Sequence, residues 1–286
     1  MNCIKKILTR IGIVLCALII LFPVLYMLSV SLQSSGEIMS PSPVLLPKPP
    51  RFGNYLAVLA SAKWHIYFLN SITVTAVTVA VSLVINVMAG YVFARIPFKF
   101  SNALFFLVLA GMMIPAQVTM IPVFTMLRQF PLAGGNNILG QGGSGLYNTL
   151  SGLILPFVGG SFGVFFSRQY YVGFPVELDY SSAIDGCGRF GAFIKIYLPL
   201  SGPLLASLGV LKFTGTWNEY TWPLIMTRTA EMRTVQLALA YFRNESGIAW
   251  GGLMGAALFI SLPVYFVFIA AQKYFISGLL SGSVKM

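Results

Sequence analysis

Charged side chains are scarce in this chain, and carboxylates are the scarcest of them. Only 9% of the residues are Asp, Glu, Lys or Arg, whereas 57% are hydrophobic. A soluble domain has about 25% charged residues, because polar groups must cover its surface. The shortage therefore excludes a soluble globular fold and predicts a membrane protein. The 18 basic residues outnumber the 7 acidic ones, but they stand singly at the ends of apolar segments. That distribution suits membrane anchoring and not a nucleic-acid-binding face.

Residues for metal, disulfide and catalytic chemistry are also few. The three cysteines (Cys3, Cys16 and Cys187) show no paired spacing, and His65 is the single histidine. Neither a disulfide framework nor a metal site is expected from such a set. No P-loop, HExxH or GxSxG motif occurs, and no nucleophile is paired with a base. The sequence predicts no catalytic residue, no metal and no cofactor bound by this chain, and it argues against an enzyme active on its own.

Long apolar runs predict an all-α membrane protein of about six transmembrane helices, since a helix needs about 20 residues to cross a bilayer. The first run could be a secretory signal, but its length and the lack of a cleavage site favour an uncleaved span. Pro115 and Pro122 in the third are expected to kink that span without ending it. One domain of residues 11–276 results, between terminal segments 1–10 and 277–286. The predicted spans are residues 11–32, 66–94, 103–127, 150–172, 198–226 and 251–275.

Loop charges predict the orientation of these spans. Lys5, Lys6 and Arg10 precede the first span, and a very short loop between Arg95 and Lys99 separates the second from the third. Short loops weigh most in the positive-inside rule. We therefore expect the N-terminus and the loop at about residues 174–196 in the cytoplasm, although the outer loops also contain arginines.

Two segments on the opposite side of the membrane look irregular. Residues 34–50 are rich in Ser and Pro, which predicts an extended segment with little helix. Residues 133–145 contain six glycines and no charge. A flexible linker is the simplest interpretation of that composition, and a loop that contacts an outside partner or lines an entrance is the alternative.

The cytoplasmic loop holds an unusual acidic cluster. Glu177, Asp179 and Asp185 are three of the seven carboxylates in the chain. Pro175 can open a helix and Asp185-Gly186 can end it after two to three turns, too few to cross a bilayer. A short charged helix between two spans is typical of a segment held by a partner in water. An ordinary loop with an Asp-Gly turn is the alternative.

Polar residues also gather inside the fifth predicted span. Lys212 and Glu219 are seven positions apart and share one helix face. An ionisable residue inside a membrane marks a functional site by default, so Lys212 should face a water-filled cavity or a carboxylate. Glu219 could instead lie in the belt of aromatic residues at the outer interface. The candidate substrate-path residues are Lys212, Trp217, Asn218, Glu219 and Trp222, with Asn70 and Asn86 as weaker candidates or helix-to-helix hydrogen bonders.

Several stretches resemble the permeases of ATP-binding-cassette (ABC) importers. In the cytoplasmic loop, Glu177-Leu178 is followed after six residues by Asp185-Gly186 and then by Leu198-Pro-Leu200, similar to the EAA loop of those proteins. The other stretches look like the carbohydrate-type subfamily, whose best-known type is the second, six-span permease of the maltose importer. They are Tyr91-Val-Phe-Ala-Arg95, Ile114-Pro-Ala-Gln-Val-Thr119, Trp217-Asn-Glu-Tyr220 with Pro223-Leu224, and Gly278-Leu-Leu-Ser-Gly-Ser-Val-Lys285.

The resemblance implies a MetI-like permease fold in which the loop forms a cytoplasmic coupling helix, seated in a cleft of an ATP-hydrolysing subunit. Two departures stand out. Tyr180-Ser181-Ser182 replaces the Glu-Ala-Ala after which the loop is named, and residues 133–145 form a longer loop than usual. The residues that the resemblance assigns to ATPase coupling are Glu177, Leu178, Tyr180, Ser181, Ser182, Ala183, Asp185 and Gly186.

The resemblance further implies a multi-pass subunit of a bacterial inner membrane, importing a sugar or oligosaccharide. Its expected partners are a second permease in a heterodimer, two ATPase subunits that bind ATP and magnesium, and an extracytoplasmic solute-binding protein. Three alternatives remain open: an ion-coupled secondary transporter, a structural membrane protein, and an ABC permease for a non-sugar solute such as a glycerol phosphate.

Overall fold

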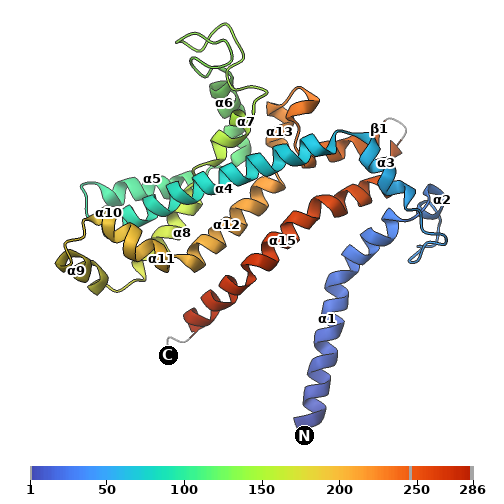
Figure 1. Ribbon diagram of the computed structural model, residues 1–286, viewed down its shortest axis with the longest axis horizontal. Helices are drawn as coiled ribbons and strands as arrows, with labels where there is room; N and C mark the ends of the chain where they lie inside the picture. Colours follow the sequence, from blue (N-terminus) through green and yellow to red (C-terminus); the bar gives the residue numbers. More distant parts are fainter. Residues whose placement is uncertain (1, 245–246, 284–286) are drawn as a thin grey trace. The chain divides into compact units, whose positions relative to one another are not determined.

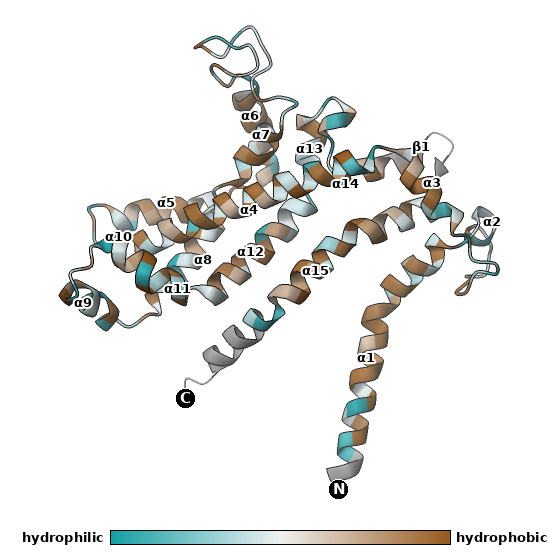
Figure 2. Cartoon of the chain, in the orientation of Figure 1, coloured by the Kyte–Doolittle hydropathy of each residue, from teal (hydrophilic) through white to brown (hydrophobic). Residues whose placement is uncertain are grey.

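A computed structural model describes residues 2–244 and 247–283 of the chain. The chain forms two compact units, one of residues 1–65 and 238–263 and the other of residues 66–237 and 264–286. Each unit consists mainly of helices that are apolar along most of their length (Figures 1 and 2). The all-α fold predicted from the sequence is therefore confirmed. Within the described residues, the strands are the short antiparallel pair β1 (Arg243–Asn244) and β2 (Gly247–Ile248).

The first unit begins with α1 (Asn2–Ser31), which contains a candidate span of 27 residues, Lys5–Ser31. After it come α2 (Ser35–Ile38) and α3 (Gly53–Ser61), and the first part of α15 (Trp250–Ser283) completes the unit. The Ser31 hydroxyl bonds the Tyr55 hydroxyl at 2.6 Å, and Trp64 stacks on Phe242. The described part of the predicted tail 277–286 is helical as far as Ser283, and residues 284–286 lie outside the described residues.

Residues 34–50 are mostly non-helical, as predicted, apart from the single turn of α2. Ser34 and Glu37 form a capping box at its start, in which the Ser34 backbone N–H donates to Oε2 of Glu37 at 2.8 Å. The same contact, with the Ser34 hydroxyl, lowers the pKa of Glu37 below its usual value.

The second unit contains most of the membrane helices. Its longest element is α4 (Trp64–Arg95), which reaches it from the first unit and contains no proline. The remaining elements are α5 (Ser101–Met113), α6 (Ala116–Arg128), α7 (Leu150–Ile154), η1 (Leu155–Phe157), α8 (Ser161–Val172), α9 (Glu177–Ile184), α10 (Arg189–Ala192), η2 (Phe193–Tyr197), α11 (Leu198–Leu200), α12 (Gly202–Trp217), α13 (Thr221–Met226), η3 (Ala230–Met232) and α14 (Val235–Ala238), and η4 (Leu239–Phe242) follows in the first unit.

Three helices within the described residues are long and apolar enough to cross a membrane, namely Lys5–Ser31, Trp64–Arg95 and Trp250–Tyr274. Three further pairs of helices pass the same test together but are bent. Counting each bent pair as one span gives six. Five of them agree with the predicted bounds to within six residues, whereas the fifth, residues 189–217, begins and ends nine residues before the predicted span 198–226. The bent pairs are Ser101–Met113 with Ala116–Arg128 (102°), Leu150–Phe157 with Ser161–Val172 (43°), and Arg189–Leu200 with Gly202–Trp217 (76°).

The bend of the third span corrects one prediction. Pro115 does not merely kink the helix, because α5 ends at Met113 and α6 starts at Ala116 after a turn of 102°. A proline disfavours the α conformation of the residue before it, and Ile114 is indeed extended (φ −85°, ψ 117°). Pro122, by contrast, lies inside α6 without ending it, as predicted.

The fifth predicted span, residues 198–226, is also not one helix. α12 ends at Trp217, and α13 starts only at Thr221. Glu219 accepts a hydrogen bond from the backbone N–H of Trp222 at 2.9 Å. A side chain that satisfies a backbone donor in this way competes with continuation of the helix.

The glycine-rich segment 133–145 is folded by hydrogen bonds. Asn136 donates to the carbonyls of Arg128 and Phe130 at 2.9 and 3.0 Å and accepts from the N–H of Gly143 at 2.8 Å. Five of its six glycines have positive φ, a conformation that favours glycine. The glycines therefore fix the path of an organised loop, which differs from the predicted flexible linker.

Candidate coupling loop and transport path

The predicted short helix of the cytoplasmic loop is present as α9. Gly186 follows it with φ +69°, and its N–H donates to the Ala183 carbonyl at 3.1 Å. Because this left-handed conformation favours glycine, the predicted role of Asp185-Gly186 as a stop is confirmed. In Figure 1, α9 lies at the end of the second unit where α4 terminates.

α9 has one face held by the protein and one face free. Ser182 is buried, and Leu178 packs against a cluster that includes Tyr171 and Tyr197. On the opposite side, Val176, Tyr180 and Ile184 are 52%, 67% and 86% exposed. These three residues are spaced by four positions and form an apolar stripe along one helix face, which we call the outer stripe. The other predicted coupling residues, Glu177, Ser181, Ala183, Asp185 and Gly186, are exposed as well.

The held face of α9 is bound to the end of α4 by an ion pair. Nη1 of Arg95 lies 3.2 Å from Oδ2 of Asp179, and the two side chains are 5% and 17% exposed. The hydroxyl of Tyr197 donates to Oδ1 of Asp179 at 2.8 Å. Both carboxylate oxygens are thus engaged by groups from other elements.

Arg95 also binds the segment that leads into α9. Its Nε donates to the Tyr171 carbonyl at 3.1 Å, and its Nη2 donates to the Phe174 carbonyl. One turn earlier on α4, the Tyr91 hydroxyl donates to the Arg189 carbonyl at 3.0 Å. The last turn of α4 therefore contacts the loop before, within and after the coupling helix.

Most of these contacts were not predicted from the sequence. Asp179 entered only as part of an acidic cluster, and Arg95 only as a charge and a motif residue. The spacing of four between Tyr91 and Arg95 places both on one face of α4 and could have marked that face as the partner of the loop. No sequence signal identified Tyr197 as the partner of Asp179.

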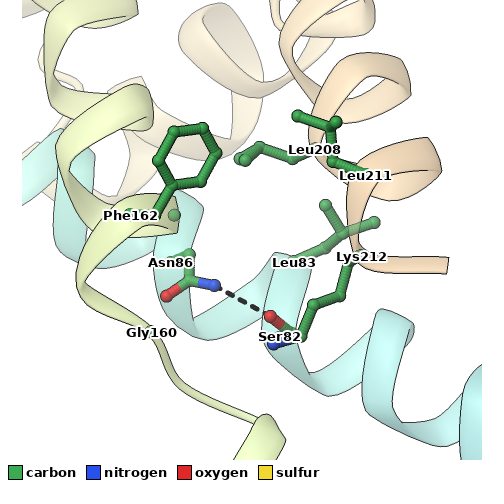
Figure 3. A pocket seen from close by; sticks show the side chains of 9 residues that line it. Ser82, Leu83, Asn86, Gly160, Phe162, Leu208, Leu211 and Lys212 are labelled. Carbon is green, nitrogen blue, oxygen red and sulfur yellow. Dashed lines mark hydrogen bonds between the residues drawn. The ribbon is translucent and has the colours of Figure 1, made fainter. Parts of the chain in front are cut away.

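Lys212 lines a cavity of about 150 Å³ between α4, α8 and α12 (Figure 3). Its Nζ lies 5.9 Å from the centre of the Phe157 ring, and within the described residues it forms no ion pair. Asn86 lines the same cavity and donates to the Ser82 hydroxyl at 2.8 Å, while its Oδ1 has no hydrogen-bond partner there. The cavity wall thus offers the Lys212 ammonium group, while Oδ1 of Asn86 is buried beside it without a partner.

Glu219 and Trp222 line a second, larger cavity of about 430 Å³. Trp222 is held in its wall by a 3.0 Å hydrogen bond from Nε1 to the Gly152 carbonyl. Trp217 and Asn218, which were expected beside them, do not line either cavity. Trp217 is buried and stacks on Phe213 with ring centres 5.6 Å apart, and Asn218 accepts a 2.9 Å hydrogen bond from Gln236.

Three interruptions of the membrane helices meet at this larger cavity. Ile114 comes from the break between α5 and α6, Gly160 from the break before α8, and Glu219 from the break between α12 and α13. Gly160 lines the smaller cavity as well. Irregular backbone at membrane depth is tolerated where it lines a cavity or is buried in protein, and interrupted helices of transporters often flank a substrate site.

Comparisons with known proteins give one consistent result. The model of the family described as "Binding-protein-dependent transport system inner membrane component" matches residues 86–280. The arabinooligosaccharides transport system permease protein of Halalkalibacterium halodurans is 34% identical over 97% of this chain and 96% of its own length. Its counterpart in Bacillus subtilis is 35% identical, over 94% and 92%.

Solved structures share the fold. One chain of a bacterial ABC transporter that imports the acidic polysaccharide alginate superposes with a TM-score of 0.77 at 24% identity, covering 96% of this chain and 97% of that one. A chain of the alginate transporter in complex with its pentasaccharide-bound periplasmic protein gives a TM-score of 0.64 at 13% identity, over 95% of each chain.

Proposed function

Because this chain belongs to the family of binding-protein-dependent transport system inner membrane components, we propose that it is a permease subunit of an ATP-driven importer of a sugar or oligosaccharide. Membership confirms the resemblance derived from the motifs, and it fits a transport component and not an ion-coupled carrier. The proposed solute class follows the relatives, whose names include arabinooligosaccharides and lactose transport.

The proposed complex contains a second permease subunit, two ATPase subunits and an extracytoplasmic solute-binding protein. The binding protein is supported by the family description and by the alginate transporter structure that includes a periplasmic protein. ATP and magnesium would be bound by the ATPase subunits alone. The N-terminus and α9 would face the cytoplasm, where an ATPase can reach them.

The outer stripe of α9 is the observation that carries this proposal. Exposed apolar residues on a helix held firmly from behind are typical of a surface that a partner covers. The stripe would lie in a cleft of the ATPase, with Glu177 and Asp185 at its two ends. Tyr180, which replaces the usual acid, would give an aromatic contact in place of a charge.

The larger cavity supports a place on the transport path. Glu219, Ser161 and Thr119 can bond hydroxyl groups, while Phe157 and Trp222 offer aromatic surfaces. Apolar walls with a few polar groups are typical of small-molecule sites. We propose that Glu219 and Trp222 contact the passing solute, that Lys212 hydrates the adjoining cavity, and that Trp217 and Asn218 support the wall from behind.

Reconstitution tests the proposal. The chain would be co-expressed with the second permease, the ATPase and the binding protein of the proposed complex, purified, and placed in lipid vesicles. We expect ATP hydrolysis to be stimulated by binding protein loaded with an arabino-oligosaccharide, and labelled oligosaccharide to accumulate in the vesicles. Failure of the ATPase to co-purify, or hydrolysis indifferent to the loaded binding protein, would contradict the assignment.

A further inference from the structure

We propose that Arg95 and Asp179 form a joint that passes the movement of coupling helix α9 to membrane helix α4. The inference rests on the proposed function, in which α9 follows the ATPase. It adds a defined mechanical link inside this chain, in which Arg95 and Asp179 act as positioning residues. Neither residue belongs to the outer stripe that would meet the ATPase.

The geometry of Asp179 favours such a joint. Its two oxygens are held from different directions, Oδ2 by Arg95 of α4 and Oδ1 by Tyr197 of η2. A carboxylate bound through both oxygens has little freedom to rotate, and charge-assisted hydrogen bonds are the stronger ones. α9 therefore cannot shift along this face without displacing Arg95 or breaking the ion pair.

Arg95 in turn is fixed by more than the ion pair. Its other nitrogens donate to the carbonyls of Tyr171 and Phe174, and its guanidinium carbon lies 5.5 Å from the centre of the Tyr197 ring. A cation at the last turn of α4 also suits the negative end of the helix dipole. Burial of the pair makes it sensitive, because removal of one partner leaves an uncompensated charge.

The displacement would then reach the cavity of Lys212. α4 is a continuous helix without proline from Trp64 to Arg95, and Ser82 and Asn86 of the same helix line that cavity. Nine residues of helix separate Arg95 from Asn86, a distance of about 14 Å at 1.5 Å per residue. No loop intervenes between the joint and the cavity wall, so a tilt of α4 at its end moves Asn86.

The test is a double-mutant cycle in the reconstituted complex. Asp179→Asn, Arg95→Gln and the double variant are compared with wild type for ATPase co-purification, ATP hydrolysis and solute uptake. Each single variant is expected to retain the ATPase but to lower uptake per ATP hydrolysed by about tenfold, within the usual range of coupling between sites. The double variant should lose no more than either single one, because the two residues act as a unit.

Tyr197→Phe is the matched control, since it removes one hydrogen bond to Asp179 and leaves the ion pair. It should lower uptake per ATP less than Asp179→Asn does. If Asp179→Asn fails to accumulate in the membrane, Arg95→Gln provides the same measurement of uptake per ATP, with the ion pair broken from the other side. If that variant takes up as much solute per ATP hydrolysed as wild type does, the proposed joint is refuted.

Two other outcomes are also decisive. Loss of the ATPase from Asp179→Asn membranes would show that the pair serves docking and would overturn its role in transmission. Additive losses in the double variant would do the same, because they would mean that each residue acts by itself. If the loaded binding protein does not stimulate ATP hydrolysis by the wild-type complex, the proposed function itself is wrong. That result is distinct from the outcomes that concern the Arg95–Asp179 joint.

Discussion

Gly163 of α8 lies against the side chain of Asn86 of α4, so closely that a methyl group on Gly163 would overlap the Asn86 amide. The same two helices meet again where Gly90 faces Ser167. Small residues at such crossings allow membrane helices to approach each other. The contact between Gly163 and Asn86 thus sets how near α8 comes to the wall of the Lys212 cavity.

Gly163→Ala should therefore destabilise the permease. Overpacking of a tight contact costs about 1–3 kcal/mol, because α8 must move or Asn86 must leave its position against Ser82. The measurement is the midpoint of thermal unfolding of the purified subunit in detergent. Gly159→Ala is the matched control, since nothing lies within 4 Å of a methyl group there; equal midpoints for the two variants would refute the tight crossing.

Gly186→Val should impair coupling through the backbone alone. No atom lies within 4 Å of a Cβ at Gly186, but its φ of +69° is unfavourable for a side chain by about 1–2 kcal/mol. We expect uptake per ATP to fall while the six spans stay folded. Gly188→Val provides the comparison, because Gly188 has φ −64° and equally open surroundings. A Gly188 variant that is as impaired as the Gly186 variant would point to the added bulk and not to the backbone.

Tyr180→Ala should release the ATPase without unfolding the permease. The Tyr180 side chain is 67% exposed, so its removal takes little from the fold, whereas a central aromatic contact in an interface is worth about 2 kcal/mol or more. The measurement is recovery of ATPase with the tagged permease. Phe100→Ala, at the same 67% exposure in another loop, should recover the wild-type amount. If Tyr180→Ala recovers as much ATPase as wild type does, the interface with the ATPase does not include Tyr180.

Lys212→Met should abolish most uptake while leaving assembly intact. Methionine keeps the length and flexibility of the side chain but removes the charge that hydrates the cavity. Leu211→Met changes a neighbouring residue of the same cavity without altering its charge and should transport normally. If Lys212→Met takes up solute at the wild-type rate, Lys212 has no role in the transport path.

The spans and the coupling helix were predictable because each depends on a local pattern. Uncharged runs of sufficient length define the spans, and Asp185-Gly186 supplies the helix stop whose positive φ is observed. Pro115 was misjudged because a proline can kink or end a helix, and neighbouring helices decide between the two. The side chains of Asn136 and Asn137 help to fold residues 133–145, and the composition of the segment does not reveal their hydrogen-bond partners.

Contacts between distant segments could not be predicted from the sequence. Arg95 and Asp179 are 84 positions apart, and a single sequence contains no sign that the end of α4 meets the middle of the loop. The helix interruptions that meet around Glu219 are a second such case. Pro115 and Glu219 were visible in the sequence, whereas the break at Gly160 lies within a span predicted as continuous. The convergence of the three breaks on one cavity follows only from the packing of the helices.

The outer stripe has a consequence for the medium in which the complex is kept. Contact through Val176, Tyr180 and Ile184 depends on the removal of apolar surface from water, and ionic strength screens such contact far less than it screens exposed ion pairs. Hydrophobic association weakens on cooling. An ATPase seated on this stripe would therefore withstand concentrated salt and dissociate more readily in the cold, the opposite of a complex held by acidic residues.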